Sequence, residues 1–329
     1  MRLFFYLLFA VLFIFSLTSC KSISSKNYVG NGIEDNDNHY PAVLEIFSDT
    51  GEGFDPENHC TSSVISHNTL LTASHCLADI DQPSEGENCT IKSSKKVKVI
   101  LPSGKEVFSK NYYLNTKFMN TYIKTVCQDM YPNMTDQEFQ TVHNTNLRSD
   151  IAIVVFDDNT FSDISPLKIS NKKVQVGDKV QLVGYAYPII LVDKSIYDGE
   201  VKVKDEVAYN QIYDKKYEHV KRYGFTTVKE NLFCGYELFE IGSPIENRAV
   251  NSPNKKDPPG VNATIELGDS GSPVLSYKNQ NLILGLPSEK VRVNKEDHTC
   301  ILTFEKENID WLKKINKETD AIIPLDEIK

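Results

Sequence analysis

Three segments that lie far apart in the chain carry a nucleophile, a base and a carboxylate. Leu267–Pro273 (Leu-Gly-Asp-Ser-Gly-Ser-Pro) places Ser270 among glycines and an aspartate, and Leu71–Cys76 places His75 after small and apolar residues. Asp150 opens an apolar run, Ile-Ala-Ile-Val-Val. A serine hydroxyl becomes a good nucleophile when a base takes its proton, and imidazole titrates near neutrality. The sequence therefore indicates nucleophilic catalysis, with a carboxylate to orient the imidazole.

Each segment has an ordinary structural explanation when it is taken alone. Gly-Asp-Ser-Gly can be a turn, and aspartate is common in turns and at strand ends. The chain order is His75, Asp150, Ser270. It differs from the order in the subtilisin and α/β-hydrolase triads, which use the same chemistry. With these residues, and from about Val29 to about Asn316, the chain resembles the trypsin and chymotrypsin family of serine proteases.

The resemblance implies an all-β, chymotrypsin-like fold of two antiparallel six-stranded β-barrels with a C-terminal α-helix. Short β-rich runs separated by turns are typical of such folds. The main runs are Ala42 to Phe47, Thr61 to Ile65, Lys96 to Leu101, Ile151 to Phe156, Lys179 to Tyr185, Val201 to Val203, Pro273 to Tyr277 and Asn281 to Leu286. Ile309, Leu312 and Ile315 recur at helical spacing, which predicts an amphipathic helix over Glu307–Asn316.

We divide the chain into five parts. They are a signal peptide (1–19), a tether or activation segment (20–38), an N-terminal barrel with a long insertion (39–165), a C-terminal barrel with an insertion (166–305), and a helix and tail (306–329). The spacings between the three reactive residues exceed those of compact family members, so we place insertions within Asp79–Asn146 and Pro188–Pro259. Such loops either rim the cleft and restrict substrates or are surface decoration.

The segment around the serine resembles the oxyanion and activation elements of the family. The backbone amides of Gly268 and Ser270 would form the oxyanion hole. Asp269 would pair with a freed N-terminal amine, and the start of Val-Gly-Asn-Gly at Val29 resembles the N-terminus of activated members. Cleavage after Tyr28 would release that amine. The alternative is that these glycines only loosen a tether.

The resemblance also assigns a substrate pocket, with Thr264 at its base and Ser288 on its wall. A neutral Thr264 argues against a preference for lysine or arginine, because a buried cation would lack a compensating charge. Glu266 stands where the family usually has a cysteine. The bases near the wall are Lys290, Arg292 and His298. They either favour an acidic substrate side chain or are solvated surface charges.

Seven cysteines leave an even number for disulfides once Cys20 is assigned to lipid, which is consistent with an oxidising compartment. The sequence leaves the pairing open. The pairs that we prefer are Cys60–Cys76, Cys89–Cys127 and Cys234–Cys300. The resemblance implies the first pair, and the other two keep each bridge within one half of the chain.

An alternative is a zinc site formed by the two His-Cys pairs, His59-Cys60 and His75-Cys76. We disfavour it because the cysteines of zinc sites more usually occur as closely spaced pairs. We expect no metal and no organic cofactor.

The N-terminus reads as a secretion signal. A basic residue precedes an apolar run, and Leu17-Thr18-Ser19-Cys20 closes the run and resembles a bacterial lipobox. Cys20 would then be lipidated, and Lys21 after it favours the outer membrane by resemblance to Gram-negative lipoproteins. The alternatives are an ordinary signal peptide cleaved nearby and an uncleaved anchor. We expect an exported lipoprotein, periplasmic or at the cell surface, that cleavage before Val29 would release.

Acidic residues outnumber basic ones by nine, which disfavours binding to nucleic acid or to anionic lipid headgroups. Attachment to a membrane would therefore come from the several acyl chains at Cys20. The expected activity is hydrolysis of peptide bonds in a protein or peptide substrate through an acyl-enzyme intermediate. The alternatives are a non-catalytic binding module on the same fold and an esterase with the same triad. The sequence does not indicate an oligomeric state.

Overall fold

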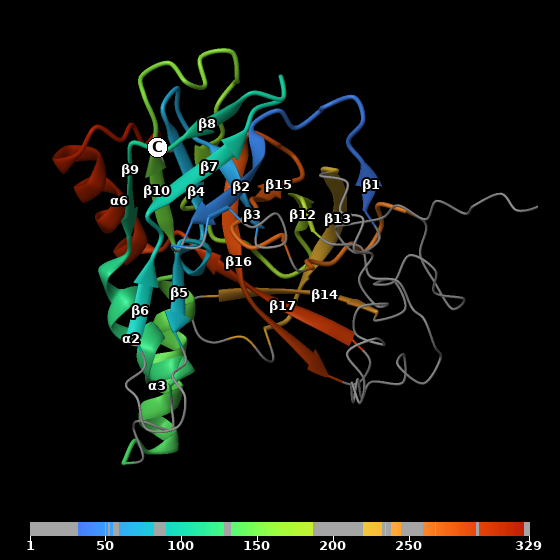
Figure 1. Ribbon diagram of the computed structural model, residues 1–329. Coiled ribbons are helices and arrows are strands. Elements are labelled where there is room, and N and C mark those ends of the chain that lie inside the picture. Colours follow the sequence, from blue (N-terminus) through green and yellow to red (C-terminus); the bar gives the residue numbers. More distant parts are fainter. Residues whose placement is uncertain are drawn as a thin grey trace, which may run out of the picture.

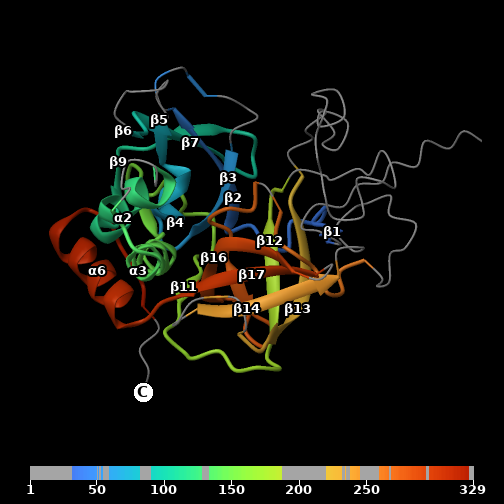
Figure 2. The same cartoon turned by 90° about the horizontal axis from the view of Figure 1, so that it is seen from below.

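We describe the protein from a computed structural model (Figure 1). It describes residues 32–49, 51, 53–54, 59–81, 90–127, 133–186, 220–231, 234, 238–244, 259–266, 268–293 and 296–325. Most strands belong to two curled sheets that lie side by side, which confirms the expected mostly-β, chymotrypsin-like fold (Figure 2). None of the helices in these residues is both long and apolar enough to cross a membrane.

The first sheet contains seven strands in the order β8-β7-β2-β3-β4-β10-β9. They are β2 (Val43–Asp49), β3 (His59–Val64), β4 (Thr69–Thr72), β7 (Lys96–Ile100), β8 (Glu106–Phe108), β9 (Asn111–Leu114) and β10 (Ala152–Val155). β8 pairs with β7 and β9 pairs with β10, although only two residues separate β8 from β9. The edge strands β8 and β9 are thus consecutive parts of one bent segment, so the two edges of the sheet lie near each other and the sheet curls around on itself.

The second sheet closes into a ring of six strands, β13-β12-β15-β16-β17-β14, because β14 also pairs with β13. These strands are β12 (Lys179–Gly184), β13 (Arg222–Lys229), β14 (Leu238–Pro244), β15 (Val274–Ser276), β16 (Leu282–Val293) and β17 (Glu296–Thr303). Two short strands lie outside the ring: β1 (Ile33–Glu34) on β13 and β11 (Lys168–Ile169) on β16. The β11–β16 pair is parallel, unlike the antiparallel pairing that the sequence predicted.

The burial of the strands follows their sequence patterns. β10 is a continuous apolar run, Ala-Ile-Val-Val, and each of its residues is buried between β4 and β9. β13 instead alternates buried and partly exposed residues along its length, as a strand with one face on a barrel core does. The apolar pattern thus marks β10, directly after Asp150, as an interior strand of the first sheet, between β4 and β9.

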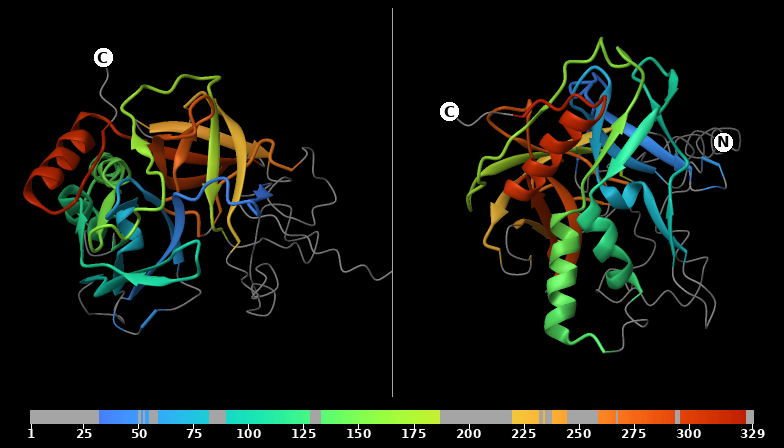
Figure 3. Two further views of the ribbon diagram at one scale, coloured as in Figure 1. Left: turned by 90° about the horizontal axis from the view of Figure 1, so that it is seen from above. Right: turned by 90° about the vertical axis from the view of Figure 1, so that its left-hand side faces the viewer.

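The first predicted insertion, 79–146, contains barrel strands as well as added elements. β7, β8 and β9 belong to the first barrel, whereas β5 (Ala78–Asp81) and β6 (Thr90–Ser93) form a separate two-stranded sheet. Two helices, α2 (Thr116–Val126) and α3 (Asp136–Arg148), pack against each other and project from the barrel (Figure 3). The elements of this range that lie outside the barrel sheet are therefore the helical hairpin between β9 and Asp150 and the small sheet.

The sequence analysis did not predict α2 and α3, although α3 carries a recognisable start signal. The side chain of Thr135 accepts a hydrogen bond from the Glu138 backbone N–H, and the Glu138 carboxylate accepts one from the Thr135 N–H at 2.9 Å. This reciprocal capping box is readable as Thr-x-x-Glu. The apolar spacing of α3 is weak, so the cap is the stronger signal of the two.

The second predicted insertion, 188–259, lies largely outside the described residues. The described parts of it form β13 and β14, which are barrel strands, and the insertion placed within this range stays a prediction. The predicted strand Val201 to Val203 also lies outside the described residues.

The C-terminal helix is confirmed as α6 (Lys306–Glu318). Its buried face carries Ile309, Leu312 and Ile315, which pack on the main hydrophobic core. This helix covers one side of the molecule next to α3 (Figure 2). The helical spacing of three apolar residues was sufficient to predict it.

Candidate active site

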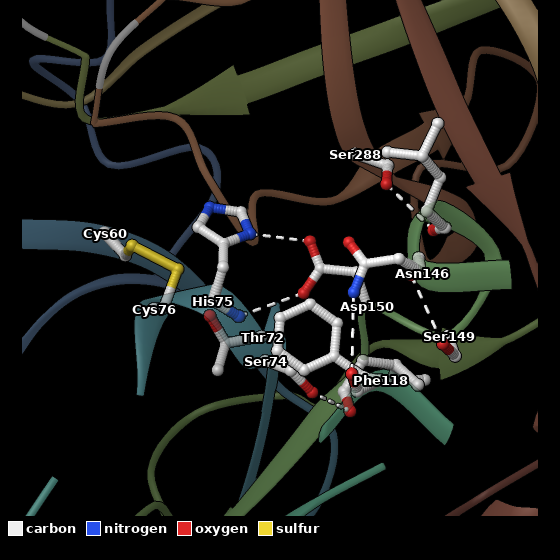
Figure 4. A network of polar contacts seen from close by, with 12 residues as sticks. Cys60, Thr72, Ser74, His75, Cys76, Phe118, Asn146, Ser149, Asp150 and Ser288 are labelled. Carbon is white, nitrogen blue, oxygen red and sulfur yellow. Dashed lines mark hydrogen bonds and ion pairs between the residues drawn. A yellow bond between two sulfur atoms is a disulfide. The ribbon is translucent and has the colours of Figure 1, made fainter. Parts of the chain in front are cut away.

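His75 and Asp150 contact each other twice (Figure 4). The His75 Nδ1 lies 2.6 Å from Asp150 Oδ2, and the His75 backbone N–H donates to Oδ1 at 3.0 Å. The pairing of β10 with β4 sets Ala152 opposite Thr72, so the residues just before β10 meet the turn after β4. The carboxylate therefore holds both the ring and the backbone of the histidine, and it favours the tautomer with the proton on Nδ1.

The turn that carries His75 is a short 3-10 helix, η1 (Ser74–Cys76), which follows β4. The Ser74 hydroxyl donates to the Ile151 carbonyl at 2.6 Å, which ties the turn to the start of β10. On the other side, the Cys60–Cys76 disulfide ties it to β3. His75 is thus held by neighbours on two strands while its side chain remains 28% exposed.

Two opposing effects act on the ionisation of His75. Burial by itself lowers the pKa of the imidazole, but the charge of Asp150 and the hydrogen bond to it outweigh burial, and the pKa is raised above its ordinary value. The Asp150 side chain is almost fully buried, at 5% exposure, so its charge is little screened by water. The pair is thus suited to stabilise an imidazolium that forms when the histidine takes a proton.

The backbone of Ser270 is fixed against the first barrel. The Ser270 carbonyl accepts a hydrogen bond from the Thr61 N–H at 2.8 Å. Gly271 has a φ of 76° and packs so tightly that a Cβ there would overlap Thr72 Oγ1 and approach the Ala73 nitrogen at 2.8 Å. Thr72 and Ala73 immediately precede η1. The serine loop of the second barrel is therefore docked beside the turn that carries the histidine.

The Ser270 hydroxyl and the His75 ring come from different barrels and are not hydrogen-bonded to each other. In the part of the chain that the structure describes, the Ser270 hydroxyl makes no hydrogen bond to His75, whose ring is bonded only to Asp150. Hydrogen bonds of this kind are often long in the absence of substrate and tighten when it binds. The structure thus joins two of the three predicted catalytic residues directly and positions the third by its backbone.

Gly268 lies against a buried polar cluster. Its φ is 95°, and a Cβ there would overlap the His59 ring, whose Nε2 lies 2.6 Å from the Tyr185 carbonyl. The Thr61 hydroxyl donates to the Gly268 carbonyl at 2.8 Å and accepts from the Tyr185 N–H at 3.1 Å. His59 also lies 3.7 Å from the buried Glu45 carboxylate. This cluster, which the sequence analysis missed, fixes the loop on which the two candidate oxyanion amides lie.

Asp269 is fully buried and incompletely bonded. Its Oδ2 accepts the Glu266 N–H at 3.0 Å, whereas its Oδ1 faces Gly184 and makes no well-aligned hydrogen bond within the described residues, although the Ala186 backbone N–H still acts to lower the pKa of the carboxyl. Burial, the largest effect, raises the pKa of Asp269 to about 8, although backbone hydrogen bonds act in the opposite direction. The carboxyl is therefore neutral over the acidic and neutral pH range. Val29, its predicted partner, lies outside the described residues.

The two segments assigned to the substrate pocket are bridged by an ion pair. Thr264 is buried, at 2% exposure, on the segment that leads to Ser270. Lys290 reaches across from β16: its Nζ lies 3.0 Å from Glu266 Oε1 and donates to the Ile265 carbonyl at 2.7 Å. The interpretation of Lys290 as a solvated surface charge is therefore wrong.

His298, another base near the predicted wall, is buried as well. Its Nδ1 lies 2.7 Å from the Glu240 carboxylate on the neighbouring strand β14. It too is therefore an internal partner and not a surface charge. The side chain of Arg292 lies outside the described residues.

Helix α3 contacts the strand that carries the predicted wall. The Ser288 hydroxyl donates to the Leu147 carbonyl at 2.8 Å, and His143 lies 3.3 Å from the Glu289 carboxylate. That carboxylate raises the pKa of His143 by its hydrogen bond, against the opposing effect of burial. The inserted helix is thus attached to strand β16 of the second barrel, at the predicted pocket wall. This attachment was not foreseen from sequence, because it joins an unpredicted helix to a distant strand.

The structure contains two of the three preferred disulfides, Cys60–Cys76 and Cys234–Cys300. Cys127 is also disulfide-bonded, and Cys89 lies outside the described residues, so the Cys89–Cys127 pair stays a prediction. The zinc alternative required free thiolates at Cys60 and Cys76, and the bond between these two sulfurs is incompatible with it.

Comparisons with known proteins agree with this architecture. A family model described as a trypsin-like peptidase domain matches residues 60–286, more than half of the chain. Among solved structures, a Glu endopeptidase in complex with MPD is similar at 13% identity and a TM-score of 0.51, covering 87% of this chain and 97% of that one. A mutant of human heparin binding protein is similar at 13% identity and a TM-score of 0.50, covering 87% and 96%. A search of curated proteins found no significant match.

The two solved structures are too distant in sequence to indicate more than the fold. The family model spans the residues from Cys60, beside the histidine turn, to Leu286, just before the predicted pocket wall. It therefore includes all three candidate catalytic residues within one continuous match. The chain belongs to the family of proteins with a trypsin-like peptidase domain.

Proposed function

We propose that the protein is a serine endopeptidase in which Ser270 is the nucleophile, His75 the general base and acid, and Asp150 the residue that orients His75. The observation that carries the proposal is the double contact of Asp150 with His75, made beside the docked Ser270 loop. A lone turn or strand-end aspartate would not need to hold both the ring and the backbone of a partly exposed histidine.

The reaction proceeds in two halves. Ser270 Oγ attacks the scissile carbonyl as His75 Nε2 takes its proton, and the imidazolium then protonates the departing amine as the C–N bond breaks. The resulting ester on Ser270 is attacked by water, again with His75 taking a proton. The proton returns to Ser270 Oγ when the acid product leaves, so the enzyme is regenerated.

The amides of Gly268 and Ser270 are proposed to bind the oxyanion of each tetrahedral intermediate. The positive φ of Gly268 and its contacts with Thr61 and His59 support a fixed loop at this point. A preorganised donor is worth on the order of 3 kcal/mol to such a transition state. The residues described here perform these steps with no cofactor.

A serine-directed phosphonate tests this assignment. We expect it to label Ser270 in the mature protein or in a form that begins at Val29, and we expect Ser270→Ala and His75→Ala to abolish labelling. Absence of labelling in both forms would support the binding-module alternative instead. If Ser270 is labelled, a comparison of matched peptide and ester substrates separates an endopeptidase from an esterase.

We further propose that cleavage after Tyr28 activates the enzyme, with the new amine of Val29 pairing with Asp269. The buried Oδ1 of Asp269, which makes no well-aligned hydrogen bond within the described residues, supports this proposal. An ammonium group beside it would lower the pKa of the carboxyl from about 8 and stabilise the charged form. Isolation of active enzyme with an intact Tyr28–Val29 bond would contradict the proposal.

The location of the protein is proposed from its N-terminus alone. Cys20 would carry the lipid that attaches an exported protein to the outer membrane, and activation before Val29 would release the catalytic domain. Metabolic labelling with a fatty acid tests this: label on the wild type and none on Cys20→Ala is the expected result. Equal labelling of both proteins would contradict it.

A further inference from the structure

Lys290 and Glu266 link the two segments that flank the candidate nucleophile. Glu266 precedes Ser270 on one segment, and Lys290 follows Ser288 on strand β16. The Lys290 ammonium lies 3.0 Å from Glu266 Oε1 and donates to the Ile265 carbonyl at 2.7 Å. The lysine side chain thus crosses from one predicted pocket wall to the other.

The burial of this ion pair is unequal. The Glu266 side chain is only 2% exposed, whereas the Lys290 side chain is 24% exposed. A buried carboxylate that loses its cation carries a desolvation penalty without compensation, so displacement of the lysine is disfavoured. A substrate side chain that enters between the Glu266 segment and strand β16 would therefore contact the intact ion pair and would not displace it.

The neighbouring residues keep the bridge in place. The Ile265 side chain packs into the core of the second barrel, which fixes the position of the backbone whose carbonyl accepts from Lys290. The Glu266 N–H donates to the buried Asp269 carboxyl at 3.0 Å. Both acceptors of the Lys290 ammonium thus belong to two adjacent buried residues, Ile265 and Glu266.

We propose that the Lys290–Glu266 pair closes the substrate pocket to all but small uncharged side chains on the acyl side of the scissile bond. This rests on the proposed peptidase function. The pair is neutral overall, so a basic or an acidic side chain would bring a charge into the pocket that has no compensating partner left, and a bulky neutral one must break the pair. Lys290 and Glu266 are therefore specificity-determining residues.

Four peptide substrates that differ only in the acyl-side residue test the proposal. For the full mature protein we expect kcat/KM to be highest for alanine and lower by at least about tenfold for phenylalanine, arginine and glutamate, since one pocket contact commonly gives that discrimination. A preference for any of the three larger residues would overturn the proposal.

Lys290→Ala removes the bridge and leaves the Glu266 carboxylate facing the opened space. We expect the arginine-to-alanine ratio of kcat/KM to rise by at least about tenfold, because the buried carboxylate would pair with the guanidinium. An unchanged ratio in a folded Lys290→Ala protein, as judged by circular dichroism, would overturn the proposal.

Two matched variants separate volume from charge. Lys290→Met retains the length of the side chain without its charge, and we expect it to keep phenylalanine excluded. Lys290→Ala combined with Glu266→Gln opens the space without a carboxylate, and we expect it to admit phenylalanine but to lose the preference for arginine. If the double variant cleaved the arginine substrate with the same kcat/KM as Lys290→Ala, Glu266 would have no role in the preference for arginine.

Benzamidine binding by calorimetry tests the same pocket without turnover. We expect binding to Lys290→Ala and at least about tenfold weaker binding to the wild type. If Ser270 is never labelled but benzamidine makes this distinction, the peptidase proposal fails and the closed pocket stands. If Ser270 is labelled and the wild type binds benzamidine as tightly as the variant, the closed pocket fails alone.

Discussion

Asp150 holds His75 by two separate atoms, the ring Nδ1 at 2.6 Å and the backbone nitrogen at 3.0 Å. The second contact orients the turn as well as the ring, because the 3-10 helix η1 begins beside this amide. Substitution of the aspartate is therefore expected to change both the tautomer and the position of the imidazole.

Asp150→Asn is expected to lower kcat by on the order of 10⁴-fold, because the amide no longer favours the productive tautomer or stabilises the imidazolium. Steady-state kinetics with a peptide substrate measure this. The matched control is Asp157→Asn, at a residue in the turn after β10 and away from the site. Equal activity of Asp150→Asn and wild type would exclude Asp150 from the mechanism.

The acid limb of the pH profile follows from the pKa of His75. The imidazole must be neutral to accept the serine proton, so kcat/KM falls as the pH is lowered through this pKa. Because Asp150 raises the pKa above the ordinary value of 6.5, we expect the midpoint above that value in the wild type. It should move to lower pH in Asp150→Asn, and a midpoint that stays fixed would contradict the assignment.

Gly271→Ala tests the docking of the serine loop on the first barrel. A Cβ at this position would overlap the Thr72 hydroxyl, so we expect a loss of about 1–3 kcal/mol in unfolding free energy, with reduced labelling of Ser270. Gly104→Ala is the control: its φ is 80°, close to the 76° of Gly271, but open space surrounds it. It should cost only the backbone strain, about 1 kcal/mol.

Thermal or urea unfolding of the two alanine variants measures this difference. Similar losses at both glycines would mean that the contact with Thr72 contributes nothing beyond backbone conformation.

Thr61→Val tests the support of the candidate oxyanion loop. The substitution removes the hydroxyl that donates to the Gly268 carbonyl and accepts from the Tyr185 N–H, and it leaves both groups unpaired. We expect a cost of about 1–3 kcal/mol in stability and a fall in kcat larger than any change in KM. Thr61→Ser retains the hydroxyl, so its stability and its kcat should be close to those of the wild type. Equal kcat values for the two variants would argue against this role.

Asp269 should make stability depend on pH. The unfolded carboxyl loses its proton near pH 3.8, whereas the folded one keeps it up to about pH 8, so stability declines as the pH rises between these values. The slope approaches about 1.4 kcal/mol per pH unit for one such group. Urea unfolding of the wild type and of Asp269→Asn across this range measures it, and the variant should lose this component.

The same measurement examines activation. A form that begins at Val29 should also lose the slope, because a paired ammonium group lowers the pKa of the Asp269 carboxyl. A slope equal to that of the uncleaved protein would mean that the new terminus does not reach Asp269.

Much of the fold was readable from local pattern. The apolar run after Asp150 became the buried strand β10, and Ile309, Leu312 and Ile315 became the buried face of α6. Such patterns are visible because the period of the chain fixes which side chains share a face. The helices α2 and α3 were missed. The apolar spacing of α3 is weak and the Thr135 cap is its main signal, whereas α2 is as amphipathic as α6 and begins at a capping residue, Asn115, so its pattern was overlooked.

The residue types and their order along the chain determined the candidate chemistry: a serine, a histidine and an aspartate in the sequence of a trypsin-like peptidase domain. Only the tertiary structure decided that Asp150 holds His75 twice, that Gly271 docks the serine loop on Thr72, and that Lys290 crosses to Glu266. These contacts join residues from different strands and barrels. They depend on strand register and on the side-chain conformations that packing allows, and neither is encoded in any one local segment.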